Sequence, residues 1–367
     1  MRQRKKYKIC LVGECLAGGG AERVQATLSD FFVKKDLCVH HVIFMDEVNY
    51  PFSGRLFNLG DVKSENPFWR KIKRFLALRN YIKNNRFDVV VDFRVKYSFW
   101  QDILISRLIY PRKTYYLIHS SNLEYYFPNA KWKAFMLYNK GKKVIGVSKG
   151  ISDKIERIYR WQHIKTIYNP INTQIVDLYA KGLNNHDFEF VLAIGRMDDN
   201  VKQFDQLIDA YAQSELPEKQ IRLIILGDGK LRKKLKEYKK SKGLDDMIMF
   251  EGFQNNPFVY MKKAKFLVLC SKFEGLPSVL IESLACGTPV ISFACESGPS
   301  EIIQHEHNGL LVENQNFEAL QQAMERMIND ESLHQKCTNN AIESVAHFSI
   351  EQVGKQWLDL LKLKRKS

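Results

Sequence analysis

Two glutamates belong to a short stretch in the second half of the sequence: Glu274 lies within a glycine- and proline-containing loop, and Glu282 lies beyond it. An apolar run of strand length, residues 266–270, precedes the loop, and Pro277 suits the first position of a following helix. A glycine loop that enters a helix offers unpaired backbone N–H groups and a partial positive charge, which favour a phosphate. Carboxylates nearby would then bind hydroxyls, so the ligand expected is a sugar nucleotide. The bare spacing of two glutamates is, by itself, better explained by an ordinary strand–helix unit with solvated side chains.

A second group of residues supplies positive charge. Arg196 directly follows Gly195 at the end of an apolar run, residues 190–194, and Lys202 stands six residues further on. Two cations fixed at a strand end can neutralise a leaving diphosphate without a metal ion, by electrostatic preorganisation. The alternative is a pair of solvated surface cations.

Two features of the first half also fit a ligand site. His119 follows a predicted strand, residues 113–118, and the carboxyl ends of strands are where α/β sheets bind ligands. Three glycines, residues 18–20, precede a predicted helix and would let the backbone approach a ligand closely. A hydrogen-bonded structural histidine and a plain tight turn are the alternatives.

Taken together, these residues closely resemble the signature of retaining glycosyltransferases with the GT-B fold, of the family-4 type (glycosyl transferases group 1). The resemblance is densest over residues 271–291 and recurs, in the expected order, at four other places over nearly the whole chain. Strands that alternate with helical patterns independently predict an α/β protein with two doubly wound domains. The resemblance implies that these Rossmann-like domains face a cleft and that the C-terminal helix crosses back to the first domain.

The predicted domains are residues 1–180, facing the acceptor or a membrane, and residues 187–345, binding the nucleotide sugar. Residues 346–367 form the predicted C-terminal helix that packs on the first domain. The polar segment 180–187 is the expected linker.

The resemblance also implies roles for individual residues. Arg196 and Lys202 would stabilise the leaving diphosphate, Glu274 would hold hydroxyls of the donor sugar, and His119 would complete the catalytic set from the first domain. Glu282 would hold the ribose, and the strand end at Gly252 and Phe253 would cup the nucleobase. The full predicted donor-binding set is Gly19, Gly20, Gly195, Arg196, Lys202, Gly252, Phe253, Glu274, Gly275, Leu276, Pro277, Ser278 and Glu282.

The implied reaction is transfer of a hexose or N-acetylhexosamine from a nucleotide-diphosphate sugar to a saccharide, with retention and by front-face attack. A UDP-sugar is expected from its frequency in the family, no metal or cofactor is expected, and the expected acceptor is a lipid-linked saccharide in cell-surface polysaccharide or glycan assembly. The alternative is a catalytically silent sugar-nucleotide-binding protein that docks on a membrane or partner. The complete set of Arg196, Lys202, Glu274 and Glu282 argues against that alternative.

Charge is distributed unevenly along the chain. Residues 1–182 hold 33 Lys and Arg against 15 Asp and Glu, and the remainder holds 23 against 26. A basic first half indicates a polyanionic partner. The predicted helix at 66–83 combines apolar residues at helical spacing with Arg70, Lys71, Lys73 and Arg74, which favours contact with an anionic membrane or lipid phosphate over a merely solvated surface helix. No nucleic-acid-binding motif is recognisable, so nucleic acid is the less favoured partner.

Together with the basic first half and the resemblance, the cysteines lead us to expect a cytoplasmic protein that is peripheral at the inner face of the cell membrane. Seven cysteines are odd in number and scattered without metal-binding spacing, as expected for small core residues in a reducing compartment. No apolar run approaches the roughly 18–20 residues that span a bilayer.

Overall fold

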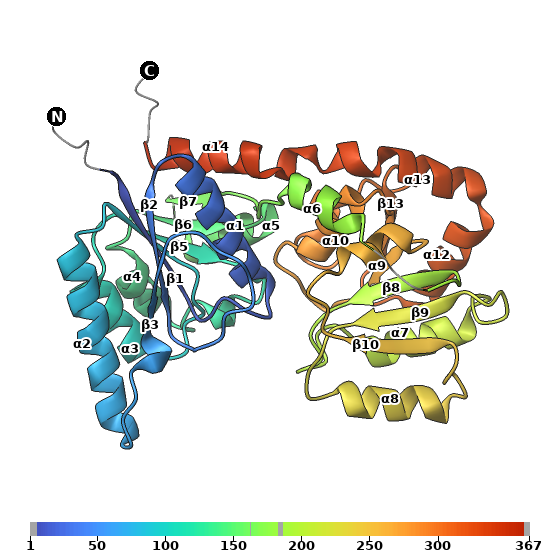
Figure 1. The fold of residues 1–367 in the computed structure, drawn as a ribbon, viewed down its shortest axis with the longest axis horizontal. Coiled ribbons are helices and arrows are strands. Elements are labelled where there is room, and N and C mark those ends of the chain that lie inside the picture. Colours follow the sequence, from blue (N-terminus) through green and yellow to red (C-terminus); the bar gives the residue numbers. More distant parts are fainter. Residues whose placement is uncertain (1–5, 162, 183–185, 363–367) are drawn as a thin grey trace. The chain divides into compact units, whose positions relative to one another are not determined.

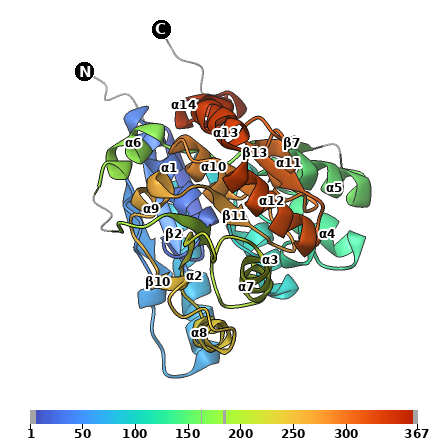
Figure 2. The same cartoon turned by 90° about the vertical axis from the view of Figure 1, so that its right-hand side faces the viewer.

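The chain forms two compact units, which Figure 1 and Figure 2 show as ribbons from two sides. The computed structural model describes residues 6–161, 163–182 and 186–362. Unit 1 takes the described residues up to Pro170 and those from Ile350 on, and unit 2 takes the described residues from Ile171 to Ser349.

Unit 1 is built on a sheet of parallel strands in the order β3-β2-β1-β4-β5-β6-β7. The order reverses between β1 and β4, so this is a doubly wound sheet with its switch point there. Buried strands read as continuous apolar runs because helices cover both faces of a parallel sheet. The strands are β1 (Lys8–Gly13), β2 (Cys38–Ile43), β3 (Arg55–Asn58), β4 (Val89–Asp92), β5 (Thr114–Ile118), β6 (Lys143–Gly146) and β7 (Ile164–Thr166).

Helices on both faces of this sheet bury its apolar residues, and the C-terminal helix α14 (Ile350–Leu360) is one of them. Trp357 of α14 is 1% exposed and meets Phe32 edge-to-face at 6.4 Å between ring centroids. The prediction that the C-terminal helix packs on the first domain is therefore confirmed. The other helices of unit 1 are α1 (Gly20–Lys34), α2 (Pro67–Asn85), α3 (Phe99–Leu104) with its π-helical continuation η2 (Ile105–Ile109), α4 (Lys131–Tyr138) and α5 (Lys149–Tyr159).

Unit 2 contains a second parallel sheet, in the order β10-β9-β8-β11-β12-β13, with its switch point between β8 and β11. The predicted fold class, an α/β protein with two doubly wound Rossmann-like domains, is thus confirmed. The strands are β8 (Phe190–Ile194), β9 (Arg222–Leu226), β10 (Ile248–Gly252), β11 (Leu267–Leu269), β12 (Val290–Phe293) and β13 (Gly309–Val312). The helices are α6 (Thr173–Ala180), α7 (Phe204–Gln213), α8 (Arg232–Ser241), α9 (Phe258–Lys263), α10 (Ser278–Ala285), α11 (Pro299–Ile302), α12 (Phe317–Asn329) and α13 (Glu331–Ser344).

The structure divides the chain earlier than the predicted domain boundary at residue 180. Helix α6 packs on α9 of unit 2, where Asn256 donates a hydrogen bond to the backbone carbonyl of Tyr179 at 3.0 Å. Of the predicted linker, residues 183–185 lie outside the described residues.

Two local details also differ from expectation. Pro277 occupies the N-cap position of α10 and the helix begins one residue later, at Ser278. The edge strand β3 was not expected, since it is short and half of it is exposed. Within the described part of the chain, every helix is too short or too polar to span a membrane.

Candidate active site

The switch point of unit 2 brings together predicted residues from two separate stretches. Gly195 and Arg196 follow β8, and the loop that contains Glu274 follows β11, the strand beside β8 in the sheet. The Lys202 ammonium forms an ion pair with Glu274 at 2.6 Å between Nζ and Oε1, with both side chains mostly buried. The sheet order thus explains how residues 72 positions apart in sequence meet, at the place where doubly wound sheets bind ligands.

The backbone fixes the position of Lys202. Its carbonyl accepts a hydrogen bond from the Cys270 thiol at 3.2 Å, and the adjacent Val201 carbonyl accepts one from the Lys272 N–H at 2.9 Å. The Lys202 side chain crosses Gly195 so closely that a Cβ there would lie 2.9 Å from Lys202 Cγ. A residue larger than glycine at position 195 would therefore displace the lysine.

Arg196 lies beside this pair with its side chain exposed. Its neighbour Met197 is buried, and the Met197 N–H donates to the Asp228 carbonyl at 2.8 Å, so the backbone under the arginine is anchored. Among the described residues Arg196 makes no ion pair, whereas Lys202 is balanced by Glu274. Arg196 therefore adds a cation that no ion pair balances in the described structure, which suits a diphosphate.

The loop before α10 is held against a second glycine loop. The Ser297 hydroxyl donates to the Gly275 carbonyl at 2.9 Å, and Gly298 has φ of +94°, so that a Cβ added to it would lie only 2.7 Å from that carbonyl oxygen. No side chain among the described residues caps the N-terminus of α10, so its first N–H groups are available to a phosphate. Glu282 lies one turn into α10 and is 6% exposed.

The predicted nucleobase residues lie at the end of β10. Gly252 has φ of +75°, and its carbonyl accepts from the Gly227 N–H at 2.8 Å, which ties β10 to β9. Phe253 is exposed at 42% and leaves an aromatic surface free. Arg232 braces this edge by donating to the Phe250 carbonyl at 3.2 Å.

In unit 1 the structure places Gly19 at the N-cap of α1 and Gly20 at its first position. The Glu22 carboxylate folds back over Gly19, where a Cβ would lie 2.1 Å from Oε2. A larger residue at position 19 would therefore require the Glu22 side chain to move away.

His119 follows β5, as predicted, and both of its ring nitrogens are buried without a hydrogen-bond partner in the described structure. The alternative of a hydrogen-bonded structural histidine therefore does not apply to its ring. Phe93 stacks on the imidazole at 5.7 Å between ring centroids. Burial lowers the pKa of His119 from 6.5 to about 3, so the imidazole is neutral at pH 7. Buried polar atoms without partners are rare, and they mark this ring as a ligand-binding candidate.

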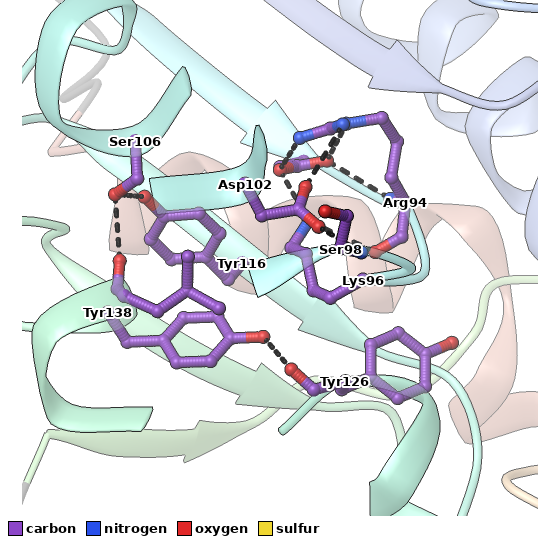
Figure 3. Close-up of polar contacts among 10 residues, drawn as sticks. Arg94, Lys96, Ser98, Asp102, Ser106, Tyr116, Tyr126 and Tyr138 are labelled. Carbon is purple, nitrogen blue, oxygen red and sulfur yellow. Dashed lines mark hydrogen bonds and ion pairs between the residues drawn. The ribbon is translucent and has the colours of Figure 1, made fainter. Parts of the chain in front are cut away.

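A buried ionic cluster at the switch point of unit 1 was missed by sequence reasoning. Asp92, the last residue of β4, accepts bonds from Arg94 at 3.0 Å and from Lys96 at 2.8 Å. Arg94 also pairs with Asp102 of α3 at 3.4 Å, as Figure 3 shows. Burial raises the pKa of Asp92, but the charges of Arg94 and Lys96 outweigh it and lower the value to about 2. Glu14, after β1, has its pKa raised by burial.

The arrangement of this cluster fixes the segment that leads from β4 into α3. The backbone N–H of Ser98 donates to Asp102 at 3.3 Å, and the Lys96 ammonium donates to the Arg94 carbonyl at 3.1 Å. The only signal in the sequence was three charged residues at alternate positions directly after an apolar strand. Among the described residues, no three His, Cys, Asp or Glu side chains gather in a way that could hold a metal ion.

The sequence matches two family models, described as Glycosyltransferase Family 4 over residues 18–175 and as Glycosyl transferases group 1 over residues 177–344. Together the two matches cover most of the chain and include residues of both units.

Two curated relatives come from Campylobacter jejuni subsp. jejuni serotype O:2. One is the N-acetylgalactosamine-N,N'-diacetylbacillosaminyl-diphospho-undecaprenol 4-alpha-N-acetylgalactosaminyltransferase, 29% identical over 94% of this chain and 97% of the relative. The other is the GalNAc-alpha-(1->4)-GalNAc-alpha-(1->3)-diNAcBac-PP-undecaprenol alpha-1,4-N-acetyl-D-galactosaminyltransferase, 30% identical over 96% of this chain and 98% of the relative. Among solved structures, a mutant of S. aureus TarM in complex with Fondaparinux, alpha-GlcNAc-glycerol and UDP aligns with a TM-score of 0.78 and 15% identity, over 97% of this chain and 99% of that chain.

Proposed function

Since this chain belongs to the GT-B glycosyltransferases of the family-4 type, we propose that it moves a hexose or N-acetylhexosamine from a UDP-sugar to a lipid-linked saccharide, with retention of configuration. The product would serve cell-surface polysaccharide or glycan assembly. The observation that carries the donor half of this proposal is the Lys202–Glu274 pair beside Arg196 at the switch point of unit 2.

In this proposal each of these groups has a task. Arg196 and Lys202 stabilise the negative charge that grows on the leaving diphosphate, and the N-terminus of α10 adds its backbone N–H groups. The Lys202 ammonium contacts both Glu274 and the diphosphate. Glu274 also accepts hydrogen bonds from hydroxyls of the donor sugar. Fixed protein cations would perform this neutralisation without a metal ion, and the neutral ring of His119 would offer its nitrogens to hydroxyls.

Retention would follow from front-face attack, in which the acceptor hydroxyl enters on the side of the leaving diphosphate. The bond between the anomeric carbon and the β-phosphate oxygen breaks, that oxygen takes the proton of the acceptor hydroxyl, and the new glycosidic bond forms as UDP leaves. UDP is the nucleotide in the bound TarM structure, and the two Campylobacter relatives are named for transfer of N-acetylgalactosamine. These names support the class of donor proposed here.

The acceptor half of the proposal has separate support. Both Campylobacter relatives are named for acceptors linked to undecaprenol through a diphosphate. An acceptor of this kind is held in a membrane, so the enzyme would work at the membrane surface. Helix α2 suits that task, because only Leu78 and Ile82 of its residues are buried and Phe68 and Trp69 are exposed.

The basic residues predicted on α2 contribute unequally. Arg70, Lys71 and Lys73 are exposed, as contact with an anionic surface requires. Arg74 is half-buried and donates to the Gly60 carbonyl at 3.2 Å. Its removal would disturb packing, so Arg70, Lys71 and Lys73 are the residues to change in a test of membrane contact.

Thermal shift against a panel of nucleotide sugars and diphosphates, with and without divalent metal, tests the donor site. A ligand at 100 times its dissociation constant should add about 2.7 kcal/mol to the free energy of unfolding. We expect one UDP-sugar to raise the melting temperature without metal, and Glu274→Gln to lower transfer by about 100-fold or more while the fold persists. Glu237→Gln, an exposed carboxylate on α8, is the matched control. Full transfer by Glu274→Gln would refute the site assignment.

A further inference from the structure

Two adjacent helices of unit 1 carry apolar side chains on their outward faces. On α3 and η2, Trp100, Leu104 and Leu108 recur every four residues and are 73%, 47% and 61% exposed. On α4, Trp132, Phe135 and Met136 have helical spacing and are 59%, 54% and 37% exposed. We call these six residues the tryptophan face.

The opposite faces of both helices are already committed to the core. Ile103 and Ile109 are buried on one helix, and Leu137 and Tyr138 on the other. The Ser106 hydroxyl donates to the Leu137 carbonyl at 2.7 Å and so ties the two helices together. A helix that is apolar on both faces is normally buried all round. These two are not, and their packing prevents a rotation that would hide the outer stripes.

Contacts between the helices make the tryptophan face continuous. The Phe99 and Trp132 rings lie 6.3 Å apart, and the Lys133 ammonium stands over both, at 5.4 Å and 5.5 Å. Arg107 reaches from η2 to the Met136 carbonyl at 2.7 Å. The stripes therefore form one surface of large side chains, far more than the single exposed residues that need no explanation.

The charges around this face favour an anionic occupant. Residues 95–142 contain eight Lys and Arg but only two acidic residues, Asp102, which is buried, and Glu124. Arg107, Lys131 and Lys142 are exposed near the two helices. Tryptophan with lysine or arginine is the combination that settles at a membrane–water interface, where the ring is in the acyl boundary and the cation meets the headgroups.

We infer that the tryptophan face is a hydrophobic membrane anchor, which inserts Trp100 and Trp132 into the interfacial layer of a bilayer that contains anionic lipid. It is distinct in position from the basic residues of α2, Arg70, Lys71 and Lys73. The inference rests on the proposed function in one respect: a lipid-linked acceptor would be reached from this bilayer. Membrane binding itself requires neither the donor site nor catalysis.

Membrane binding through surface charge and membrane binding through insertion of apolar side chains respond differently to salt. Screening weakens the attraction of exposed charges, whereas burial of apolar surface persists. Wild-type protein is therefore mixed with vesicles of phosphatidylglycerol and phosphatidylethanolamine at low salt and at about 0.5 M salt, and co-sedimentation is measured. We expect Trp100→Ser with Trp132→Ser to lower the salt-resistant binding by tenfold or more. Neutralisation of Arg70, Lys71 and Lys73 should lower mainly the low-salt binding.

Ile342→Ser, an exposed apolar residue on α13 of unit 2, is the matched control and should bind like the wild type. Brominated lipids give an independent measurement, because they quench tryptophans that enter the acyl region. Quenching should occur in the wild type and fall sharply in the Trp100→Phe, Trp132→Phe variant, whose aromatic area is largely kept. Unchanged salt-resistant binding in the serine variant, or no quenching in the wild type, would overturn the inference.

Thermal shift with the UDP-sugar separates this result from the proposed function. Loss of vesicle binding with an intact shift in the serine variant supports the anchor and shows that the variant is folded. An absent shift in a wild-type protein that still binds vesicles would contradict the donor site and leave the anchor standing.

Discussion

His119 is the predicted site residue whose environment has the clearest chemical consequence. Its ring nitrogens are buried without partners among the described residues, and burial lowers its pKa from 6.5 to about 3. The unfolded chain therefore binds a proton between those two values while the folded protein does not, so the free energy of unfolding falls as the pH decreases from 6.5 towards 3.

At about pH 5 this one group should remove about 2 kcal/mol of stability relative to neutral pH. His119→Gln cannot bind this proton, and we expect its stability to depend less on pH over that window in urea denaturation. His163→Gln changes an exposed histidine and is the control. Equal acid sensitivity of the wild type and His119→Gln would show that the ring is not buried as described. His41, whose pKa burial lowers to about 4, and His40 and His347, whose pKa values burial also lowers, contribute further acid sensitivity.

Residue types and spacing pointed to Arg196 and Lys202, because cations at a strand end suit a diphosphate leaving group, whereas the family resemblance singled out Glu274. Their ion pair could not be predicted, since it depends on β11 lying beside β8. The cluster around Asp92 was missed for a related reason. Charged residues after a strand are usually solvated, and only the tertiary structure shows that Arg94 is buried and paired with Asp92 of β4 and Asp102 of α3.

At the scale of elements, the loop before α10 depends on a neighbouring glycine loop for its shape. Gly298 lies in the left-handed region, and a Cβ there would press on the Gly275 carbonyl and the Pro277 ring, at 2.7 Å and 2.6 Å. Gly243 has a similar φ of +72°, but a Cβ there would meet nothing within 4 Å. Substitutions at these two glycines therefore distinguish the cost of backbone strain from the effect of a clash with the loop before α10.

Gly243→Ala should cost about 1 kcal/mol of stability from strain alone and leave donor binding unchanged. Gly298→Ala should cost more, and it should also weaken binding of the UDP-sugar about tenfold or more, because the loop that holds Glu274 must move. Isothermal titration and urea denaturation measure the two effects. Equal donor affinity in both variants would mean that the loop shape is not set by this contact.

Apolar runs of about four to six residues predicted most strands of both sheets to within one or two residues. The edge strand β3 was not predicted, because it is only four residues long and has a polar residue at each end. Its first two residues, Arg55 and Leu56, are exposed, so the strand does not need the continuous apolar sequence of a buried strand. Helix α6 was placed in the first domain because the polar stretch after it resembled a linker. Its packing on α9 decides otherwise, and such packing is not encoded in local composition.

At the scale of the whole molecule, the chain returns to its first unit at its end. Trp357 joins the core around Phe32, and Tyr115 of β5 donates to the Leu360 carbonyl at 3.3 Å. Gly354 is packed so tightly that a Cβ would lie 2.4 Å from Phe31 Cζ. Unit 1 is thus completed by residues that follow the whole of unit 2 in sequence, and its stability must depend on them.

Trp357→Ala removes a fully buried ring and should destabilise unit 1 by about 3–5 kcal/mol. Because only unit 1 is destabilised, the variant should unfold in two steps, unit 1 first and unit 2 second. The donor residues Arg196, Lys202 and Glu274 all belong to unit 2, so a UDP-sugar should raise the temperature of the second step only. Lys355→Ala, an exposed change on the same helix, should leave a wild-type melting curve. Differential scanning calorimetry with and without the ligand measures both transitions. A single transition at the wild-type temperature in Trp357→Ala would contradict the place of α14 in the core of unit 1. If the ligand instead raised the temperature of the first step, unit 1 would have to contribute to donor binding as well.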